Sequence, residues 1–215
     1  MQIRWNGLGS FTIIGKPISG EVTLVTDPFD ASTGLRFPRA LSVSLIVQSH
    51  DSNGANNSAA VLKEGDKPWF LVHHAGEYEV RGVFVIGIHA PLKDGTPHSI
   101  YRLELEDMSI GFLVALDRPL TDKEMEYLGA IDILIIPAGG KIVLSPQEAA
   151  AAVAQIEPRL IIASYVNSEG LKTALASAQD LAQEIGCATQ VVNTLKITKS
   201  ALPQDDELMI LLSRS

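Results

Sequence analysis

The sequence predicts a mixed α/β fold in which two β-sheets pack face to face and helices cover the outside. Strand-like segments fill the first half of the 215-residue chain, whereas buried apolar strands alternate with helices in the second half. Apolar residues make up 46% of the chain and charged residues 20%, a balance typical of a globular protein. No repeat, linker or shift in composition divides the sequence, so we expect one domain over residues 1–215.

The first half contains alternating or continuous apolar segments separated by turn-forming residues. We expect strands over residues 2–5, 10–14, 21–26, 41–47, 69–73, 78–80, 83–89, 99–105 and 108–114. Asn6-Gly7 is expected to form the first turn, and Glu106-Asp107 the turn of a hairpin. Residues 51–58 are rich in Asn, Ser and Gly, which predicts a loop.

The second half carries clear signals for the starts of helices. Capping-box patterns at 121–124 and 145–148 predict helix starts, and the second helix should run to about residue 156. A third helix is expected from about Ser168 to Ile185, with Gly186 ending it. Buried strands are expected over residues 131–136, 160–164, 189–192 and 208–212.

Composition excludes several classes of function. Lys and Arg number 17 against 25 Asp and Glu, and the resulting charge of −8 argues against a nucleic-acid partner. A single cysteine, Cys187, excludes an internal disulfide and a Cys-rich zinc module, and an inert thiol is expected. No apolar run approaches about 18 residues, and the N-terminus lacks a basic-then-apolar leader. We therefore expect a cytoplasmic protein without a membrane partner.

Several short motifs, in this order and spacing, resemble the metallo-β-lactamase fold superfamily, and within it a small bacterial group of zinc-dependent hydrolases. The motifs are WNGLGSF at 5–11, TDPF at 26–29, SHD at 49–51, GEYEV at 76–80, PLT at 119–121, IPAGG at 136–140 and IEPR at 156–159. The resemblance covers nearly the whole chain. It implies a four-layer αββα sandwich with a metal site at one edge between the two sheets.

The same resemblance implies zinc ligands that this chain has lost. The family uses a His-x-His-x-Asp-His loop, a later His, a bridging Asp and a final His, and His50 matches the first of these. The other ligand positions carry Ser52, Gly54, Ala55, Phe112, Ala115 and Tyr165. If the alignment is shifted by one residue, Ser164 stands at the last position in place of Tyr165. In the first loop, Leu8 stands where the family has a His. A zinc site needs three or four protein ligands, so we predict no zinc site of the family type and no other cofactor.

These losses predict a metal-free, non-catalytic member of the family that acts as a binding or interaction module. The alternative is a hydrolase with a reassembled or metal-independent site around His50, in which Ser52 is the nucleophile, Asp27 the orienting group and Asp51 a neighbour. A third interpretation is a structural subunit that forms a homo-oligomer or assembles with an active paralogue.

Other polar residues favour structural interpretations. His73 and His74 are expected on a strand, where neighbours point to opposite faces, so they should not share one metal ion. Adding His89 and Glu77 gives an alternative interpretation, a surface metal site. Glu77 and Glu79 should form a solvated face, His98 should be a solvated loop residue, and residues 139–140 should form a tight turn.

Overall fold

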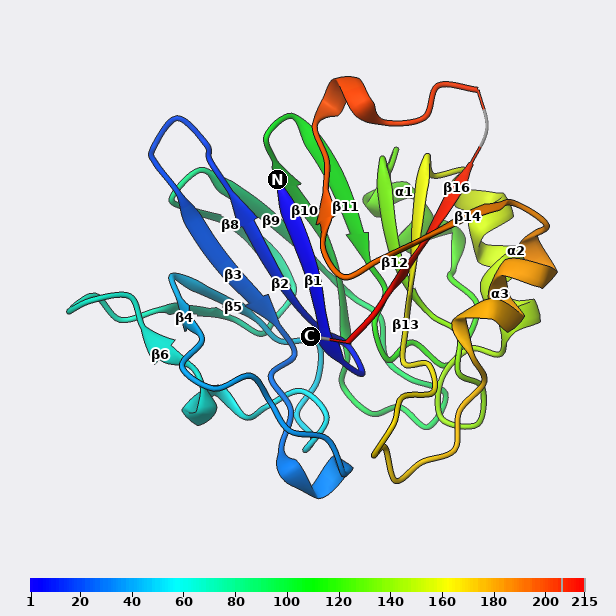
Figure 1. Cartoon of the computed structure of the whole chain (residues 1–215), viewed down its shortest axis with the longest axis horizontal. Helices are drawn as coiled ribbons and strands as arrows, with labels where there is room; N and C mark the ends of the chain where they lie inside the picture. The colour runs from blue at the N-terminus through cyan, green and yellow to red at the C-terminus, as the bar shows by residue number, and fades with distance from the viewer. Residues whose placement is uncertain (206, 215) are drawn as a thin grey trace.

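Two β-sheets face each other in the computed structural model, which describes residues 1–205 and 207–214 (Figure 1). The six-stranded sheet has the order β15 (Leu195–Lys196), β1 (Gln2–Gly7), β2 (Ser10–Gly15), β3 (Val22–Thr26), β5 (Leu45–Val47) and β7 (Phe70–Val72). The eight-stranded sheet has the order β14 (Ala188–Val192), β16 (Leu208–Leu212), β13 (Leu160–Ser164), β12 (Ile133–Pro137), β11 (Met108–Phe112), β10 (Ser99–Leu105), β9 (Val83–His89) and β8 (Gly76–Val80). The predicted sheet-on-sheet architecture is confirmed.

The main hydrophobic core fills the space between these sheets. Phe11 of β2 and Phe112 of β11 are fully buried and meet edge to face, with ring centroids 6.5 Å apart. Parallel pairing of β11, β12 and β13 places Phe112, Ile135 and Ile162 side by side in register. These three residues therefore present their side chains on the inner face of the eight-stranded sheet.

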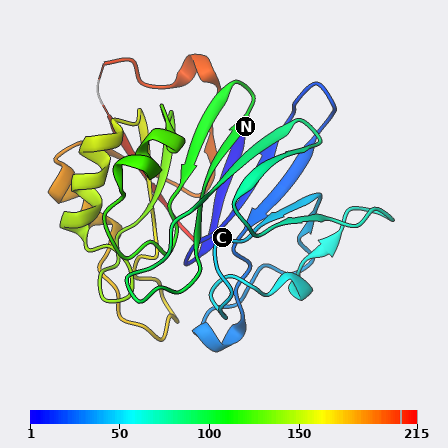
Figure 2. The same ribbon diagram turned by 180° about the vertical axis from the view of Figure 1, so that it is seen from behind.

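All three α-helices lie on the outer side of the eight-stranded sheet, as Figures 1 and 2 show. They are α1 (Asp122–Leu128) against β9, α2 (Pro146–Ile156) against β12, and α3 (Ala178–Ile185) against β13 and β16. The six-stranded sheet is covered instead by 3₁₀ turns at Ala31–Thr33 and Ser58–Ala60 and by the two-stranded sheet of β4 (Ser42–Val43) and β6 (Leu62–Lys63).

The predicted helix starts are correct for α1 and α2 and wrong for α3. Both capping boxes form, at Thr121 with Glu124 and at Ser145 with Glu148. The third helix begins after Ser177, whose side chain accepts a hydrogen bond from the Asp180 amide. Residues 168–176 are an irregular segment held by backbone hydrogen bonds to distant parts of the chain, so they do not extend the helix.

Smaller differences concern turns and strand ends. The Glu106-Asp107 turn is confirmed, with φ of 53° and 61°, as a type I′ hairpin requires. The first turn lies at residues 8–9 instead of 6–7, since β1 extends to Gly7. The expected strand 41–47 is split into β4 and β5, and β7 ends at Val72, one residue before His73. In the described part of the chain, no helix is long and apolar enough to cross a membrane.

Candidate functional site

A fully buried aspartate lies at one edge of the sandwich, directly after β3. Asp27 accepts a hydrogen bond from the Ser49 amide at Oδ1, at 2.7 Å, and from Ser49 Oγ at Oδ2, at 2.6 Å. Burial raises the pKa of Asp27 to about 8, and the hydrogen bonds from Ser49 only partly oppose it. Both oxygens of this buried carboxyl group therefore accept hydrogen bonds from the same residue, Ser49.

Ser49 connects Asp27 to His50. Its Oγ atom lies 2.8 Å from Nδ1 of His50, so the order of groups is Asp27, Ser49, His50. Burial, reinforced by the neighbouring His98, lowers the pKa of His50 to about 4, so the imidazole is neutral at pH 7. Asp27 thus orients His50 through Ser49, a link that the sequence did not reveal.

Three of the positions that the family resemblance assigns to metal ligands meet beside Nε2 of His50. A Cβ atom placed on Gly54 would lie 3.1 Å from the Tyr165 hydroxyl, 3.7 Å from Ser52 Oγ and 3.8 Å from His50 Nε2. Residues 50, 52 and 54 belong to one loop, and Tyr165, which is distant in sequence, borders the same small space.

Asp51 and Ala55 take other roles in the same loop. Asp51 is exposed and accepts a hydrogen bond from Asn56 Nδ2 at 2.7 Å. Ala55 is fully buried, and its amide donates to the carbonyl of Ser52. Both residues therefore stabilise the turn over residues 51–56, and the side chain of Ala55 has no donor atom.

Val114 occupies the other side of this site and was not predicted from the sequence. A Cβ atom on Gly9 would lie 2.0 Å from Val114 Cγ1, 2.9 Å from Tyr165 Cε2 and 3.0 Å from Asp27 Oδ2. Phe112, by contrast, belongs to the core between the sheets and packs on Phe11. Val114, an aliphatic residue two positions after Phe112, therefore lies close to the same point as Tyr165 and Asp27.

Left-handed backbone conformations are concentrated around the site. Leu8, Asp27, Ala115 and Tyr165 have φ of 49°, 37°, 63° and 47°, respectively. Such conformations cost free energy in residues other than glycine, on the order of 1–3 kcal/mol each, and occur often at functional sites. Four non-glycine residues at this edge of the sandwich therefore hold strained backbone conformations.

The side chains at this site do not fit a zinc ion. Ser52 and Tyr165 contribute neutral hydroxyl groups, and burial, together with the charge of Asp27, raises the pKa of Tyr165 further. Gly54 and Ala115 carry no donor atom, and Ser164 contributes only a buried hydroxyl, without a hydrogen-bond partner among the described residues. His50 is the one imidazole at this point, and no three His, Cys, Asp or Glu side chains in the described ranges could hold a metal together.

His98 is buried, contrary to the expectation of a solvated loop residue. Only 2% of its surface is exposed, and it pairs with His50 in an isolated β-bridge. Its Nδ1 atom lies 2.9 Å from the Ala90 carbonyl oxygen and its Nε2 atom 2.6 Å from that of Val114. Burial lowers the pKa of His98, although both carbonyls oppose this shift. His98 therefore holds the 113–116 segment, which carries Ala115, against the β9–β10 connection.

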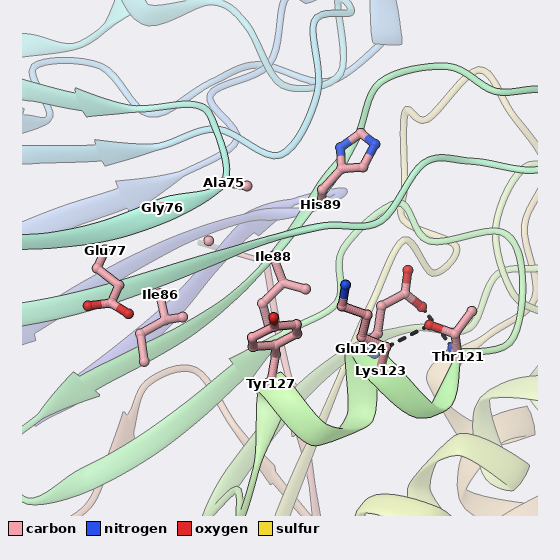
Figure 3. A pocket seen from close by; sticks show the side chains of 11 residues that line it. Ala75, Gly76, Glu77, Ile86, Ile88, His89, Thr121, Lys123, Glu124 and Tyr127 are labelled. Carbon is pink, nitrogen blue, oxygen red and sulfur yellow. Dashed lines mark hydrogen bonds between the residues drawn. The ribbon is translucent and has the colours of Figure 1, made fainter.

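One hollow borders the site, and a second adjoins the first. One is a cleft of about 450 Å³ between the ends of β5 and β7 and the β9–β10 connection, and His50 and Asp51 line it. The other, of about 390 Å³, lies between β8, β9 and α1, where Tyr127 stands beside Ile86 and Ile88 (Figure 3). The two hollows share Ala75 and His89. Glu77 lies in the second hollow and far from His89 in Figure 3.

Comparisons with known proteins agree with this architecture. A metal-dependent hydrolase of Thermoplasma acidophilum is 25% identical over 198 residues, which cover 78% of this chain and 84% of the relative. A solved structure of a candidate Zn-dependent hydrolase of the metallo-β-lactamase superfamily from Thermotoga maritima has a TM-score of 0.80 at 24% identity and covers 98% of both chains. A metallo hydrolase of Ignicoccus hospitalis has a TM-score of 0.63 at 15% identity and covers 86% of this chain and 90% of its own.

A family model described as the beta-lactamase superfamily domain matches residues 2–164. The match includes the Asp27–Ser49–His50 chain and the converging positions 52 and 54. It spans most of the sequence, and the chain therefore belongs to the β-lactamase superfamily.

Proposed function

We propose that this protein is a metal-independent and non-catalytic member of its family that acts in the cytoplasm as a binding or interaction module. The observation that carries the proposal is the convergence of His50 with Ser52, Gly54 and Tyr165. Where zinc chemistry needs several imidazole and carboxylate ligands, this space offers one imidazole nitrogen and two neutral hydroxyl groups. Such a set suits hydrogen bonding to a polar ligand, and its one candidate base, His50, has a pKa lowered to about 4.

Metal analysis tests the proposal. Untagged protein expressed with added zinc is passed through a gel-filtration column, and its zinc content is measured by atomic absorption. We expect well under one firmly held ion per chain, and a melting temperature that chelator leaves unchanged, because no metal-binding energy is coupled to folding. About one firmly held zinc per chain, with a fall in melting temperature on chelation, would overturn the proposal.

A metal-independent hydrolase is the second candidate, and the Asp27–Ser49–His50 chain is the observation that favours it. Nδ1 of His50 is held by Ser49, so its Nε2 atom faces the space that Ser52 also borders. The low pKa of His50, about 4, makes it a weak general base at neutral pH, which is why we rank this candidate second. A His50→Gln variant tests it with 4-nitrophenyl esters: loss of a measurable parental activity would favour the hydrolase.

The interaction partner, on the leading proposal, is a second copy of the chain or an active relative. Exposed apolar side chains support a surface role, among them Phe70, Phe84 and Tyr127, each about half exposed. Sedimentation equilibrium of the purified protein distinguishes the partners, since a self-associating chain gives a mass above that of the monomer.

A further inference from the structure

The outer face of β9 carries a row of apolar side chains. Val83 and Val85 of this strand are fully buried between the sheets, so the alternating residues Phe84, Ile86 and Ile88 point to the opposite, outer face. The helix α1 packs against β9, and yet Phe84 remains about half exposed and Ile86 only partly buried. Exposed apolar patches that are rimmed by polar residues mark surfaces that bind other proteins.

Tyr127 of α1 extends this apolar row sideways. Its ring is about half exposed and stands beside Ile86 and Ile88 in the hollow of about 390 Å³ (Figure 3). At the other end of the row, Phe84 borders a further hollow, of about 1040 Å³, which the fully exposed Ile18 also lines. We call the surface formed by Phe84, Ile86, Ile88 and Tyr127 the β9 face.

Two opposite charges stand at opposite ends of the hollow beside Tyr127. Glu77 lies at one end and Lys123 at the other, with Ile86, Ile88 and Tyr127 between them in Figure 3. Both charged side chains are exposed, and neither has an ion-pair partner in the described part of the chain. The Lys123 ammonium group lies 5.8 Å from the centroid of the Tyr127 ring. A two-fold axis through the apolar part would bring Glu77 of each copy toward Lys123 of the partner subunit, so the face is complementary to itself.

We propose that the β9 face is the contact surface of a symmetric dimer, in which a second copy of this chain packs its own β9 face on the first. The inference rests on the proposed function in that it names the surface through which an interaction module associates. In a two-fold interface each contact occurs twice, so two pairs of Glu77 with Lys123 flank an apolar centre built from both copies of Ile86 and Tyr127. The apolar centre provides most of the affinity, and the charged pairs set the register.

Pairing through the free edge of β8 is the alternative way to join two copies, and the sequence of that strand opposes it. β8 is the last strand of the eight-stranded sheet, so its outer backbone edge is open to a further strand. A two-fold axis at Tyr78, the middle of the strand, would place Glu77 of one copy opposite Glu79 of the partner subunit. Like charges in directly opposite positions destabilise a sheet. The β9 face is therefore the better contact surface.

Exchange of the charges at positions 77 and 123 tests this dimer. Sedimentation equilibrium at about 0.15 M NaCl is measured for the full-length, untagged parent, Glu77→Lys, Lys123→Glu and the double variant. We expect a dimer for the parent. Each single variant should associate at least about tenfold more weakly, because it brings like charges together at both ends of the face. The double variant should recover the dimer, because both pairs are restored with their signs exchanged.

A mixture of the two single variants gives the sharpest result. At positions 77 and 123, the Glu77→Lys chain carries only lysines and the Lys123→Glu chain only glutamates. In a mixed dimer both pairs are therefore complementary, whereas neither variant can form such pairs with itself. We expect the equimolar mixture to associate at least about tenfold more tightly than either variant alone.

Truncation of exposed aromatic rings tests the apolar centre. Phe84→Ser and Tyr127→Ser remove large side chains from the β9 face and should each weaken association by at least about tenfold. Phe70→Ser is the matched control, since Phe70 is exposed to a similar extent but belongs to the edge strand β7 of the other sheet. This control should leave the dimer unchanged. Circular dichroism spectra of all variants confirm that they are folded.

Contrary results separate this dimer from the proposed function. A monomeric parent, or a mixture of the single variants that associates no better than each alone, would overturn the dimer and leave the metal-free, non-catalytic function standing. Loss of the dimer in Phe70→Ser, with retention in both charge variants, would place the contact on another surface and would also overturn this proposal. About one firmly held zinc per chain in a protein that passes every dimer test would overturn the proposed function and leave the β9 contact standing.

Discussion

The Tyr165 hydroxyl lies 3.1 Å from the point where Gly54 would carry a Cβ atom. Tyr165 follows the end of β13, and Gly54 belongs to the loop after β5, so the contact joins the two sheets at the edge of the sandwich. The aromatic ring also reaches toward Gly9 and Asp27. A bulky neutral side chain therefore fills part of the space that the family resemblance assigns to metal ligands.

This contact predicts coupling between the two residues. Gly54→Ala should lower the free energy of unfolding by about 1 kcal/mol, because the new methyl group crowds the hydroxyl. Tyr165→Phe removes that hydroxyl, so the double variant should recover most of the loss. Urea unfolding of the parent, the two single variants and the double variant measures the coupling. Strictly additive effects would contradict the contact between position 54 and the Tyr165 hydroxyl.

Ser49 should be needed for stability because it satisfies a buried carboxyl group. Ser49→Ala leaves Oδ2 of Asp27 without its 2.6 Å partner and should cost about 1–3 kcal/mol of unfolding free energy. Ser49→Thr keeps the hydroxyl and is the matched control, with a smaller expected loss. Equal losses in the two variants would show that packing, and not the hydrogen bond, determines the effect.

The raised pKa of Asp27 predicts that the stability of the protein depends on pH. Because its folded-state pKa is raised to about 8 from 3.8, the folded state binds an extra proton between these values, and stability falls as the pH rises. His50, lowered to about 4 from 6.5, acts in the opposite direction, but only below about pH 6.5. Between pH 6.5 and 8 the parent should therefore lose roughly 1 kcal/mol per pH unit relative to Asp27→Asn. Parallel stability curves for the two proteins over this range would show that Asp27 does not titrate there.

Ser164 carries a buried hydroxyl without a hydrogen-bond partner in the described ranges, so its removal should not destabilise the fold. Ser164→Ala is expected to be neutral or to stabilise the protein by up to about 1 kcal/mol. Ser10, also fully buried, accepts a hydrogen bond from Asn6 Nδ2 at 3.1 Å and is the matched control. Ser10→Ala should lower the free energy of unfolding by about 1 kcal/mol. Thermal unfolding of the parent and of both variants measures the two effects.

Partial restoration of the ligand loop should not restore zinc chemistry. The triple variant Ser52→His, Gly54→Asp and Ala55→His adds donors to one loop, but Phe112, Ala115 and Tyr165 still supply none of the remaining ligands. We expect no zinc-dependent hydrolysis of esters or phosphodiesters above that of the parent. Turnover that appears with zinc and disappears with chelator would show that the loop alone is sufficient, and would contradict the assignment of the lost ligands.

Much of the fold could be predicted because its signals are local. The capping boxes at Thr121 and Ser145 and the continuous apolar strands β12 and β13 each lie within a few residues of sequence. The start of α3 was missed because residues 168–176 are held by partners elsewhere, such as the Gly139 carbonyl that accepts from the Ala176 amide. Local propensity does not report such contacts.

The sequence by itself predicted most of the strands and helices and the family resemblance, and it led to the hypothesis that Ser52, Gly54, Ala115 and Tyr165 stand at metal-ligand positions. Only the tertiary structure decided that Ser49 lies between Asp27 and His50, that Val114 borders the site, that His98 is buried, and that five histidines share one cleft. The physical reason is the range of the interactions. Helix caps and strand patterns act within one segment, whereas burial, pKa shifts and side-chain convergence arise where segments distant in sequence meet at the edge of two packed sheets.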